Sequence, residues 1–422
     1  MKNKYIIILN FILACSLFGQ VENSSKESPY AFNPGFYLDV ANYKSLETGK
    51  TKVDIFLQIP YHTLKFIKED DGFKSKFSIS IIFMDEDKKN VFAEKLWNQE
   101  VKAANSDEYL SKENFKYFYT SFNLTPGKYI LRCEIIDKGS NKNGLTEANI
   151  NVTDFNENIN ISDIILVKGM VNNQVVPNVA RYITGSDSSI TFFYDIFSDT
   201  GKIMKINYSI LDKKQNEIFT SNDTLNLKKD KNRIFKTLNN VKLALGEYVI
   251  VVKLLDNKDK IIKSMIKRIF SNITGFPQSI TDLDKAVSQL VYIAVGDEQS
   301  FIEESKDYEE KLNRFRAFWK AKDPTPNTIE NEVFNEYYRR IAYSNEKFKT
   351  YMEGWKTDMG MVYILLGPPN NVERHPFEYD SKPYEIWEYY TLNRRFLFVD
   401  ETGFGEYRLA NRVFGDWFRY RQ

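Results

Sequence analysis

The apolar and polar positions between residues 30 and 155 alternate in the manner of short β-strands. In KFSISIIFMDED the apolar residues recur at every second position, which places four of them on one face of a half-buried strand: Phe77, Ile79, Ile81 and Phe83. FKYFYTSFNL and KYILRCEIID follow. Thr125-Pro126-Gly127 between them predicts a hairpin turn, because proline fixes one φ angle and glycine tolerates a positive one. About seven strands at this spacing predict an antiparallel sandwich.

A second segment, residues 160–273, repeats this pattern. LTPGKYILRCEIID aligns with LALGEYVIVVKLLD, and FMDEDKKNVF aligns with ILDKKQNEIF. The repetition predicts two tandem all-β immunoglobulin-like sandwich modules, over residues 30–155 and 160–273. In the first alignment Tyr129 matches Tyr248. We expect each tyrosine to begin a strand and to be fixed by packing and a hydroxyl hydrogen bond, with a ligand-binding role as the weaker alternative.

From about residue 276 the period changes to that of helices. Apolar residues recur at helical spacing within 283–294, 308–319 and 329–341, and in 308–319 charged residues fill the opposite side. GMVYILLG, YEIWEYY, RRFLFVD and GEYRLAN then read as strands. Residues 276–422 are therefore predicted to form an α+β domain, with the helices first and a small sheet after them.

The first twenty residues have the pattern of an export signal. Two lysines precede an apolar run that is shorter than the roughly 20 residues of a membrane-spanning helix and ends before Gly19. We expect a signal peptide over residues 1–20 and an exported chain that is periplasmic, outer-membrane-associated or secreted. Lipid attachment at Cys15 is the alternative, although the neighbouring residues fit that pattern poorly. No later segment predicts a transmembrane helix.

Composition argues against several function classes. The chain has 58 basic and 57 acidic residues and a net charge of +1, so capture of nucleic acid is not indicated. Apart from Cys15 there is one cysteine, Cys133, which the alternating strand pattern predicts to be buried. His62 and His375 lack metal ligands at close spacing. Neither a G-x-S-x-G elbow nor a P-loop lysine occurs, so we expect no metal and no cofactor.

Four stretches in the last third of the chain carry a resemblance to a known family. FWKAKDPTPNTIENEVFNEYYRRIAYSNEKF, GWKTDMGMVYILLGPPNNVE, PYEIWEYY and FLFVDETGFGEYRL together closely resemble the GWxTD domain. The family motif and the turn that follows it stand here at Gly354, Trp355, Thr357, Asp358, Gly360, Gly367, Pro368 and Pro369. Met359 departs from the family, which often has arginine there. The resemblance implies an exported protein of Bacteroidota or related Gram-negative bacteria, with no assigned biochemical activity.

Asp358 is the motif residue with the clearest capacity for chemistry. Glycoside cleavage uses two carboxylates at a defined separation, and the candidate partners are Glu373, Glu385 and Asp400. The interpretation we favour is a turn entering the strand MVYILL, in which Thr357 and Asp358 tie down backbone amides. Gly360 and the Gly-Pro-Pro turn would then bound that strand.

Aromatic side chains near the motif allow a second kind of site. Trp355, Trp387, Tyr389 and Tyr390 could stack on sugar rings, but aromatics also form the core of small sheets, which we favour. The sequence thus predicts a non-catalytic interaction or scaffold protein of the cell envelope, whose partner is an envelope protein or a glycan. The alternatives are a carboxylate-dependent envelope enzyme acting on glycan or peptidoglycan, and a carbohydrate-binding module.

Overall fold

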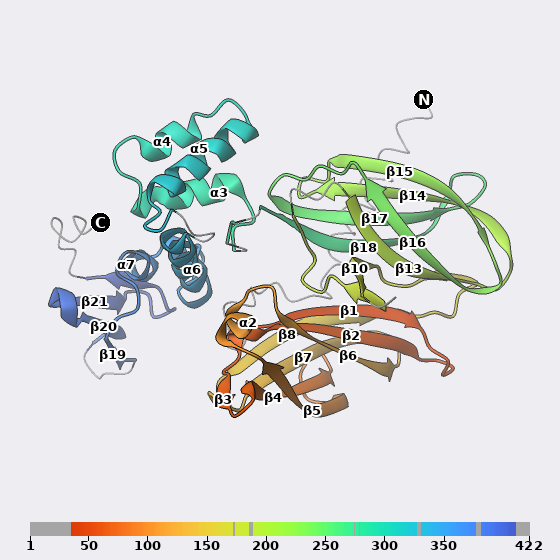
Figure 1. The fold of residues 1–422 in the computed structure, drawn as a ribbon, viewed down its shortest axis with the longest axis horizontal. Coiled ribbons are helices and arrows are strands. Elements are labelled where there is room, and N and C mark those ends of the chain that lie inside the picture. The colour runs from red at the N-terminus through yellow and green to blue at the C-terminus, as the bar shows by residue number, and fades with distance from the viewer. Residues whose placement is uncertain are drawn as a thin grey trace. The chain divides into compact units, whose positions relative to one another are not determined.

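The computed structural model describes residues 35–171, 174–184, 189–273, 275–277, 279–326, 331–376 and 381–410. The predicted signal peptide and Cys15 lie outside these ranges. The chain divides between Ile273 and Thr274 into two compact units, the first made of sheets and the second of helices followed by a small sheet (Figure 1). No helix in the described ranges is both long enough and apolar enough to cross a membrane.

Two sheets face each other in the first half of the N-terminal unit. One has the strand order β1 (Tyr37–Lys44), β2 (Thr51–Pro60), β6 (Phe115–Leu124). The other has the order β3 (Ile67–Glu69), β4 (Gly72–Met84), β7 (Gly127–Asp137), β8 (Asn143–Val152), and β5 (Val91–Ala103) also pairs with β4. The short helix α2 (Ser106–Leu110) precedes β6. Both sheets contribute to one core, in which the four alternating residues predicted to be buried, Phe77 to Phe83, are fully buried.

The hairpin predicted at Thr125-Pro126-Gly127 is wrong. β6 pairs with β2, whereas β7 pairs with β4 and β8, so this turn carries the chain from one sheet to the other. Proline and glycine mark a chain reversal in either case, and the sequence does not distinguish the two. The hydroxyl of Tyr129 donates to the carbonyl oxygen of Thr125 at 2.8 Å, so the expected hydrogen bond at this strand start is confirmed.

The second half of the N-terminal unit again has two sheets. One has the order β11 (Gln174–Pro177), β10 (Ile165–Val171), β13 (Ser189–Ser198), β16 (Asp230–Asn239), with β9 (Ile159–Ile161) also paired with β13. The other has the order β12 (Tyr182–Thr184), β18 (Ile261–Asn272), β17 (Gly246–Leu255), β14 (Lys202–Asp212), β15 (Glu217–Leu227). The hydroxyl of Tyr248 donates to the carbonyl oxygen of Ala244, four residues upstream, at 3.0 Å. Tyr129 makes the same contact with Thr125 in the first half.

Buried polar contacts connect the two halves of this unit. The ammonium group of Lys267 on β18 lies 2.6 and 2.7 Å from the two carboxylate oxygens of Asp39 on β1, and both side chains are buried. The carboxylate of Asp163 accepts from the backbone amide of Asn42 at 2.7 Å and from its side-chain amide at 2.8 Å. Burial raises the pKa of Asp163. Since a charge removed from water needs a partner, these contacts fix β1 against the second pair of sheets.

The C-terminal unit begins with five α-helices among its described residues: α3 (Leu283–Ser288), α4 (Glu298–Glu303), α5 (Tyr308–Ala321), α6 (Glu332–Lys347) and α7 (Asp358–Leu366). A 3-10 turn, Gln289–Tyr292, follows α3, and another, Gly354–Lys356, precedes α7. The antiparallel sheet that follows has the order β19 (Asn371–His375), β20 (Tyr384–Tyr389), β21 (Arg394–Asp400), β22 (Tyr407–Leu409). The predicted order of helices before sheet is confirmed.

The helix starts follow capping chemistry. The N-cap side chains of α3, α5, α6 and α7 each accept a hydrogen bond from the amide three residues later, and these caps are Asp282, Asp307, Asn331 and Thr357. The helix predicted over residues 329–341 therefore starts later, at Glu332, and Ile329 lies outside the described residues. Val291 is 45% exposed rather than buried, because α3 ends at Ser288 and the chain continues as a 3-10 turn.

GMVYILLG is a helix and not the predicted strand. α7 is capped by Thr357 and ends at Gly367, which has a φ of 79°. Met359, Val362, Tyr363 and Ile364 are all buried. A short helix that is apolar on nearly every side gives the same sequence pattern as a buried strand, since neither shows a polar face. Gly360 consequently lies in the first helical turn and does not bound a strand.

Candidate functional site

The two glycines of the GWKTDMG segment lie at points of close backbone contact. A Cβ atom on Gly354 would lie 1.8 Å from the carbonyl oxygen of Ser344 on α6. A Cβ atom on Gly360 would lie 1.9 Å from the carbonyl oxygen of Gly354. The 3-10 turn is thus in contact with α6 on one side and α7 on the other, at separations that only glycine permits.

Thr357 ties the 3-10 turn to α7. Its hydroxyl accepts a hydrogen bond from the amide of Gly360 at 3.0 Å and donates one to the carbonyl oxygen of Gly354 at 2.8 Å. The first bond is a helix N-cap, and the second fixes the end of the preceding turn. Threonine supplies both bonds because a hydroxyl is a donor and an acceptor at once.

Asp358 connects α7 to the last strand of the sheet. Its Oδ2 accepts from the backbone amide of Leu409 on β22 at 2.8 Å. The residue is in the first turn of α7, where a negative charge interacts favourably with the helix dipole. Burial, and to a lesser degree the charge of Asp358, raises the pKa of Tyr292 to about 12. The side chain that the sequence marks as a catalytic candidate therefore holds a backbone amide.

Trp355 is a core residue with its polar atoms bonded. It is 6% exposed, its ring nitrogen donates to Glu353 at 3.0 Å, and its amide donates to the side-chain oxygen of Asn345 at 3.1 Å. The hydroxyl of Tyr292 donates to the Trp355 carbonyl oxygen at 2.9 Å. Lys356 is exposed, with its ammonium group 5.1 Å from the Trp355 ring centre. These contacts give the glycine, tryptophan, threonine and aspartate of the motif a structural role and leave the lysine at the surface.

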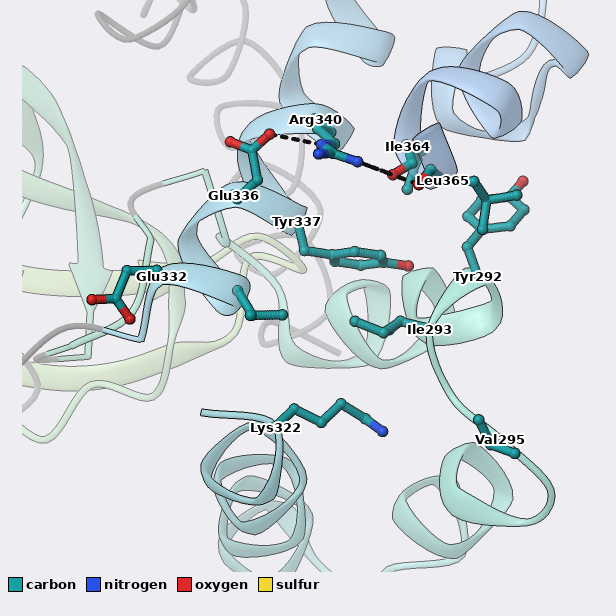
Figure 2. Close-up of a pocket in the computed structure, with 11 residues that line it drawn as sticks. Tyr292, Ile293, Val295, Lys322, Glu332, Glu336, Tyr337, Arg340, Ile364 and Leu365 are labelled. Carbon is teal, nitrogen blue, oxygen red and sulfur yellow. Dashed lines mark hydrogen bonds and ion pairs between the residues drawn. The ribbon is translucent and has the colours of Figure 1, made fainter. Parts of the chain in front are cut away.

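The other carboxylates proposed as partners of Asp358 each have separate contacts. Glu385 accepts from Arg374 and from the ring nitrogen of Trp387, both at 3.1 Å. A carboxylate oxygen of Glu373 lies 3.7 Å from Arg395. Figure 2 shows a cavity among the helices of the C-terminal unit, and neither Glu373 nor Glu385 lines it.

Asp400 closes the turn between β21 and β22. Its carboxylate accepts from the amides of Gly403 at 2.9 Å and Gly405 at 2.6 Å, and from Thr402. Burial raises the pKa of Asp400, but these amide bonds outweigh that effect and hold the pKa below its ordinary value. Asp400 is thus an ionised structural residue of the turn.

The aromatic residues considered for sugar stacking divide into two groups. Trp355, Trp387 and Tyr389 are buried, and the hydroxyl of Tyr389 donates to the carbonyl oxygen of Gly367 at 2.8 Å. Tyr390 is 64% exposed.

Pro368 and Pro369 of the family motif lie just past Gly367, where α7 ends. Proline is common at this position because it cannot continue a helix.

The histidines and the cysteine are dispersed. Cys133 is fully buried in the first core, as predicted, and burial raises the pKa of its thiol. The ring of His375 stacks on Tyr384 with centres 4.3 Å apart. Within the described ranges, no three His, Cys, Asp or Glu side chains come together in a way that could hold a metal ion.

A cavity of about 630 Å³ lies among the helices of the C-terminal unit (Figure 2). The sequence did not predict it, because its walls come from four separate segments of the chain, and the segment with Ile364 and Leu365 was predicted to be a strand. The only signal in the sequence is the spacing of Glu332, Glu336 and Arg340, which puts three charged residues on one stripe of α6. The lining also includes Tyr292, Ile293, Val295, Lys322, Val333, Tyr337, Ile364 and Leu365.

Residues 254–410 match the family described as "GWxTD domain". Among solved structures, the chain is similar to red sea bream transglutaminase at 10% identity, over 56% of this chain and 31% of that chain, with a TM-score of 0.18. It is also similar to a glycosyl hydrolase family 2 member from Bacteroides cellulosilyticus at 12% identity, over 58% of this chain and 29% of that chain, with a TM-score of 0.24. The chain spans less than a third of either protein. A search of curated proteins found no match.

Proposed function

This chain is a GWxTD domain-containing protein, and on that basis we propose that it is a non-catalytic interaction or scaffold protein of the bacterial cell envelope. One observation carries the proposal. The polar groups of the motif are engaged in holding the domain together: Thr357 caps α7, Asp358 holds the amide of Leu409, and the amide and ring nitrogen of Trp355 are both bonded. Because these polar groups bond within the domain, the motif stabilises the fold, and we infer that the function lies on the surface of the domain.

The alternative of a carboxylate-dependent enzyme receives less support. A general acid or base must be within hydrogen-bonding reach of a substrate. Asp358, Glu385 and Asp400 instead contact a backbone amide, an arginine with a tryptophan, and a turn, respectively. The carbohydrate-binding alternative requires exposed coplanar aromatic rings, and three of its four candidate residues are buried.

We further propose that the β-rich N-terminal unit consists of two immunoglobulin-like modules in tandem. The strand order β1-β2-β6 opposite β5-β4-β7-β8 recurs as β10-β13-β16 opposite β15-β14-β17-β18. In each half a tyrosine at the start of a strand donates to a carbonyl four residues upstream, as in the tyrosine corner of immunoglobulin-like sandwiches. Modules of this kind commonly serve as spacers and contact surfaces in exported proteins.

The placement in the envelope rests on the N-terminal sequence, where lysines precede a short apolar run. Export is tested directly by fractionation of cells that produce the tagged full chain, together with mass measurement of the mature N-terminus. A chain cleaved near Gly19 supports a free exported protein, and a lipid-modified Cys15 supports an anchored one. An uncleaved chain in the cytoplasm contradicts the proposal.

The central experiment separates a scaffold from an enzyme. The purified mature chain is incubated with peptidoglycan sacculi, and released fragments are measured for the wild type and for Asp358→Asn, Glu385→Gln and Asp400→Asn. The proposal expects no release above that of heat-unfolded protein from any of the four proteins. In parallel, chemical crosslinking in cells identifies a partner, whose complex is then rebuilt from purified components. Turnover by the wild type that disappears in Asp358→Asn overturns the proposal.

A further inference from the structure

The cavity of Figure 2 has a mainly apolar surface. Two of its polar lining groups are used inside the domain, since the hydroxyls of Tyr292 and Tyr337 donate to the carbonyl oxygens of Trp355 and Gln289. The uncharged lining residues other than these two tyrosines are all aliphatic: Ile293, Val295, Val333, Ile364 and Leu365. A volume of about 630 Å³ is large enough for several aliphatic side chains, and is within the usual range of ligand pockets.

The charged groups at the rim are paired within the chain. The ammonium of Lys322 lies 3.2 Å from the carboxylate of Glu298. The Nε of Arg340 lies 2.7 Å from Glu336, and its Nη1 donates to the carbonyl oxygen of Ile364 at 3.1 Å (Figure 2). An occupant of the apolar part consequently needs no buried charge of its own, and a charged ligand group there would lack a counter-ion.

Charge nevertheless changes sign along the α6 wall. Glu332, in the first turn of α6, is exposed and accepts from the hydroxyl of Thr325. Two turns later, Arg340 lines the cavity and shares the carboxylate of Glu336 with Arg339, which does not line it, so these three side chains together carry one positive charge in excess. The negative and positive ends are about 12 Å apart at 1.5 Å per helical residue.

One apolar residue of the cavity lining is also exposed to solvent. Val295 lines the cavity and is 54% exposed, and Val291, one turn earlier in the chain, is 45% exposed. A small molecule would cover the cavity alone, whereas a protein segment would cover this rim as well.

We propose that the cavity binds an amphipathic segment of a partner protein, with apolar residues in the cavity, a basic residue at Glu332 and an acidic residue at Arg340. This assignment rests on the scaffold function proposed above and names the contact surface. The occupant has the charge pattern opposite to that of α6, which both fixes its orientation and excludes segments with the same charge at both ends.

The test is a selection of random displayed peptides on the full mature chain, followed by fluorescence anisotropy of the selected peptides. We expect a consensus with an apolar centre flanked by charges of opposite sign. Val333→Asp, which places a carboxylate in the apolar wall, should weaken binding at least about tenfold. Glu332→Lys should weaken the original peptides, and a new selection on this variant should replace the basic flank by an acidic one. The replacement is the decisive result, because a structural defect would not reverse a charge preference.

Glu309→Lys is the matched control, since Glu309 is an exposed acid on α5 that does not line the cavity, and it should leave both affinity and consensus unchanged. Circular dichroism melting curves confirm that each variant is folded. The absence of a consensus, or a consensus unaffected by Glu332→Lys, overturns the proposal. If cis-parinaric acid, a fluorescent fatty acid, binds to the wild type but not to Val333→Asp, and no peptide binds, the cavity is assigned to acyl chains instead. None of these negative results bears on the crosslinking test of the scaffold function.

Discussion

Gly360, in the first turn of α7, lies against the carbonyl oxygen of Gly354, at a separation that leaves no space for a side chain. Replacement of a helical glycine by alanine at a position with free space normally stabilises a helix by about 1 kcal/mol. Here the added methyl must displace the 3-10 turn. We expect Gly360→Ala to lower the free energy of unfolding by more than about 2 kcal/mol, measured by urea denaturation. Gly169→Ala, where a Cβ has nothing within 4 Å, is the control. A stabilised Gly360→Ala variant would contradict the close contact.

The cap at Thr357 predicts a difference between two small substitutions. Thr357→Ala removes the acceptor for the amide of Gly360 and should cost about 1 kcal/mol or somewhat more, since the bond to Gly354 is lost as well. Thr357→Ser keeps the hydroxyl and should retain most of the stability. Equal losses in the two variants, measured by urea unfolding of each, would show that the methyl group and not the hydrogen bonds matters.

Asp358 should tolerate loss of its charge better than loss of its oxygen. The carbonyl oxygen of Asp358→Asn can still accept from the amide of Leu409, whereas Asp358→Ala leaves that amide without this acceptor. We expect Asp358→Ala to cost about 1–3 kcal/mol and Asp358→Asn clearly less. Hydrogen exchange at the Leu409 amide gives a local readout, with faster exchange expected only in the alanine variant. Similar exchange in both variants would rule out this role for the carboxylate.

Asp400 should make the C-terminal unit sensitive to acid. Its folded-state pKa is lower than in the unfolded chain, so its stabilising contribution is complete above the unfolded value of about 3.9 and is lost as the pH falls through the folded value. The urea midpoint of the wild type should therefore fall more between neutral pH and about pH 3 than that of Asp400→Asn. Parallel pH profiles would show that the turn amides do not stabilise the carboxylate.

The buried pair of Lys267 and Asp39 predicts strong coupling. Lys267→Met leaves a buried carboxylate without its cation and should cost about 3–5 kcal/mol. The double variant with Asp39→Leu should be more stable than Lys267→Met alone, because the carboxylate that lost its cation is then absent as well. The exposed pair of Lys89 and Asp87 serves as the comparison in a second double-mutant cycle, where a coupling below about 1 kcal/mol is expected. Additive effects at Lys267 and Asp39 would contradict the contact.

The sequence predicted those features that depend on local period and local chemistry. Alternation at Phe77 to Phe83 identified a buried strand face, and the Gly-x-Tyr repeat identified the hydroxyl bonds of Tyr129 and Tyr248. The predictions were wrong where two different structures give the same local sequence pattern. The apolar run of α7 reads equally as a strand, and the turn at Pro126 reads equally as a hairpin.

Most features of the candidate site depend on contacts between residues far apart in the sequence, which no local sequence pattern can predict. The partner of Asp358 is an amide 51 residues later, and Gly354 meets α6 at Ser344. The cavity needs four separate segments to be brought together, which the period of each helix cannot reveal. The sequence did favour a structural role for Thr357 and Asp358, through the tendency of short oxygen-bearing side chains to bind nearby amides, but it assigned that role to the wrong secondary structure.

The contact between Lys267 and Asp39 also constrains how the chain matures. The two residues are 228 positions apart, so Asp39 on β1 cannot contact Lys267 until β18 has been made. Until β18 has been made, Asp39 lacks this cation. The N-terminal unit is therefore complete only when β18 has been made, immediately before the helices of the C-terminal unit. A chain that ended earlier would leave the carboxylate of Asp39 without this cation and β1 exposed, and quality-control proteases can recognise such incompletely folded chains.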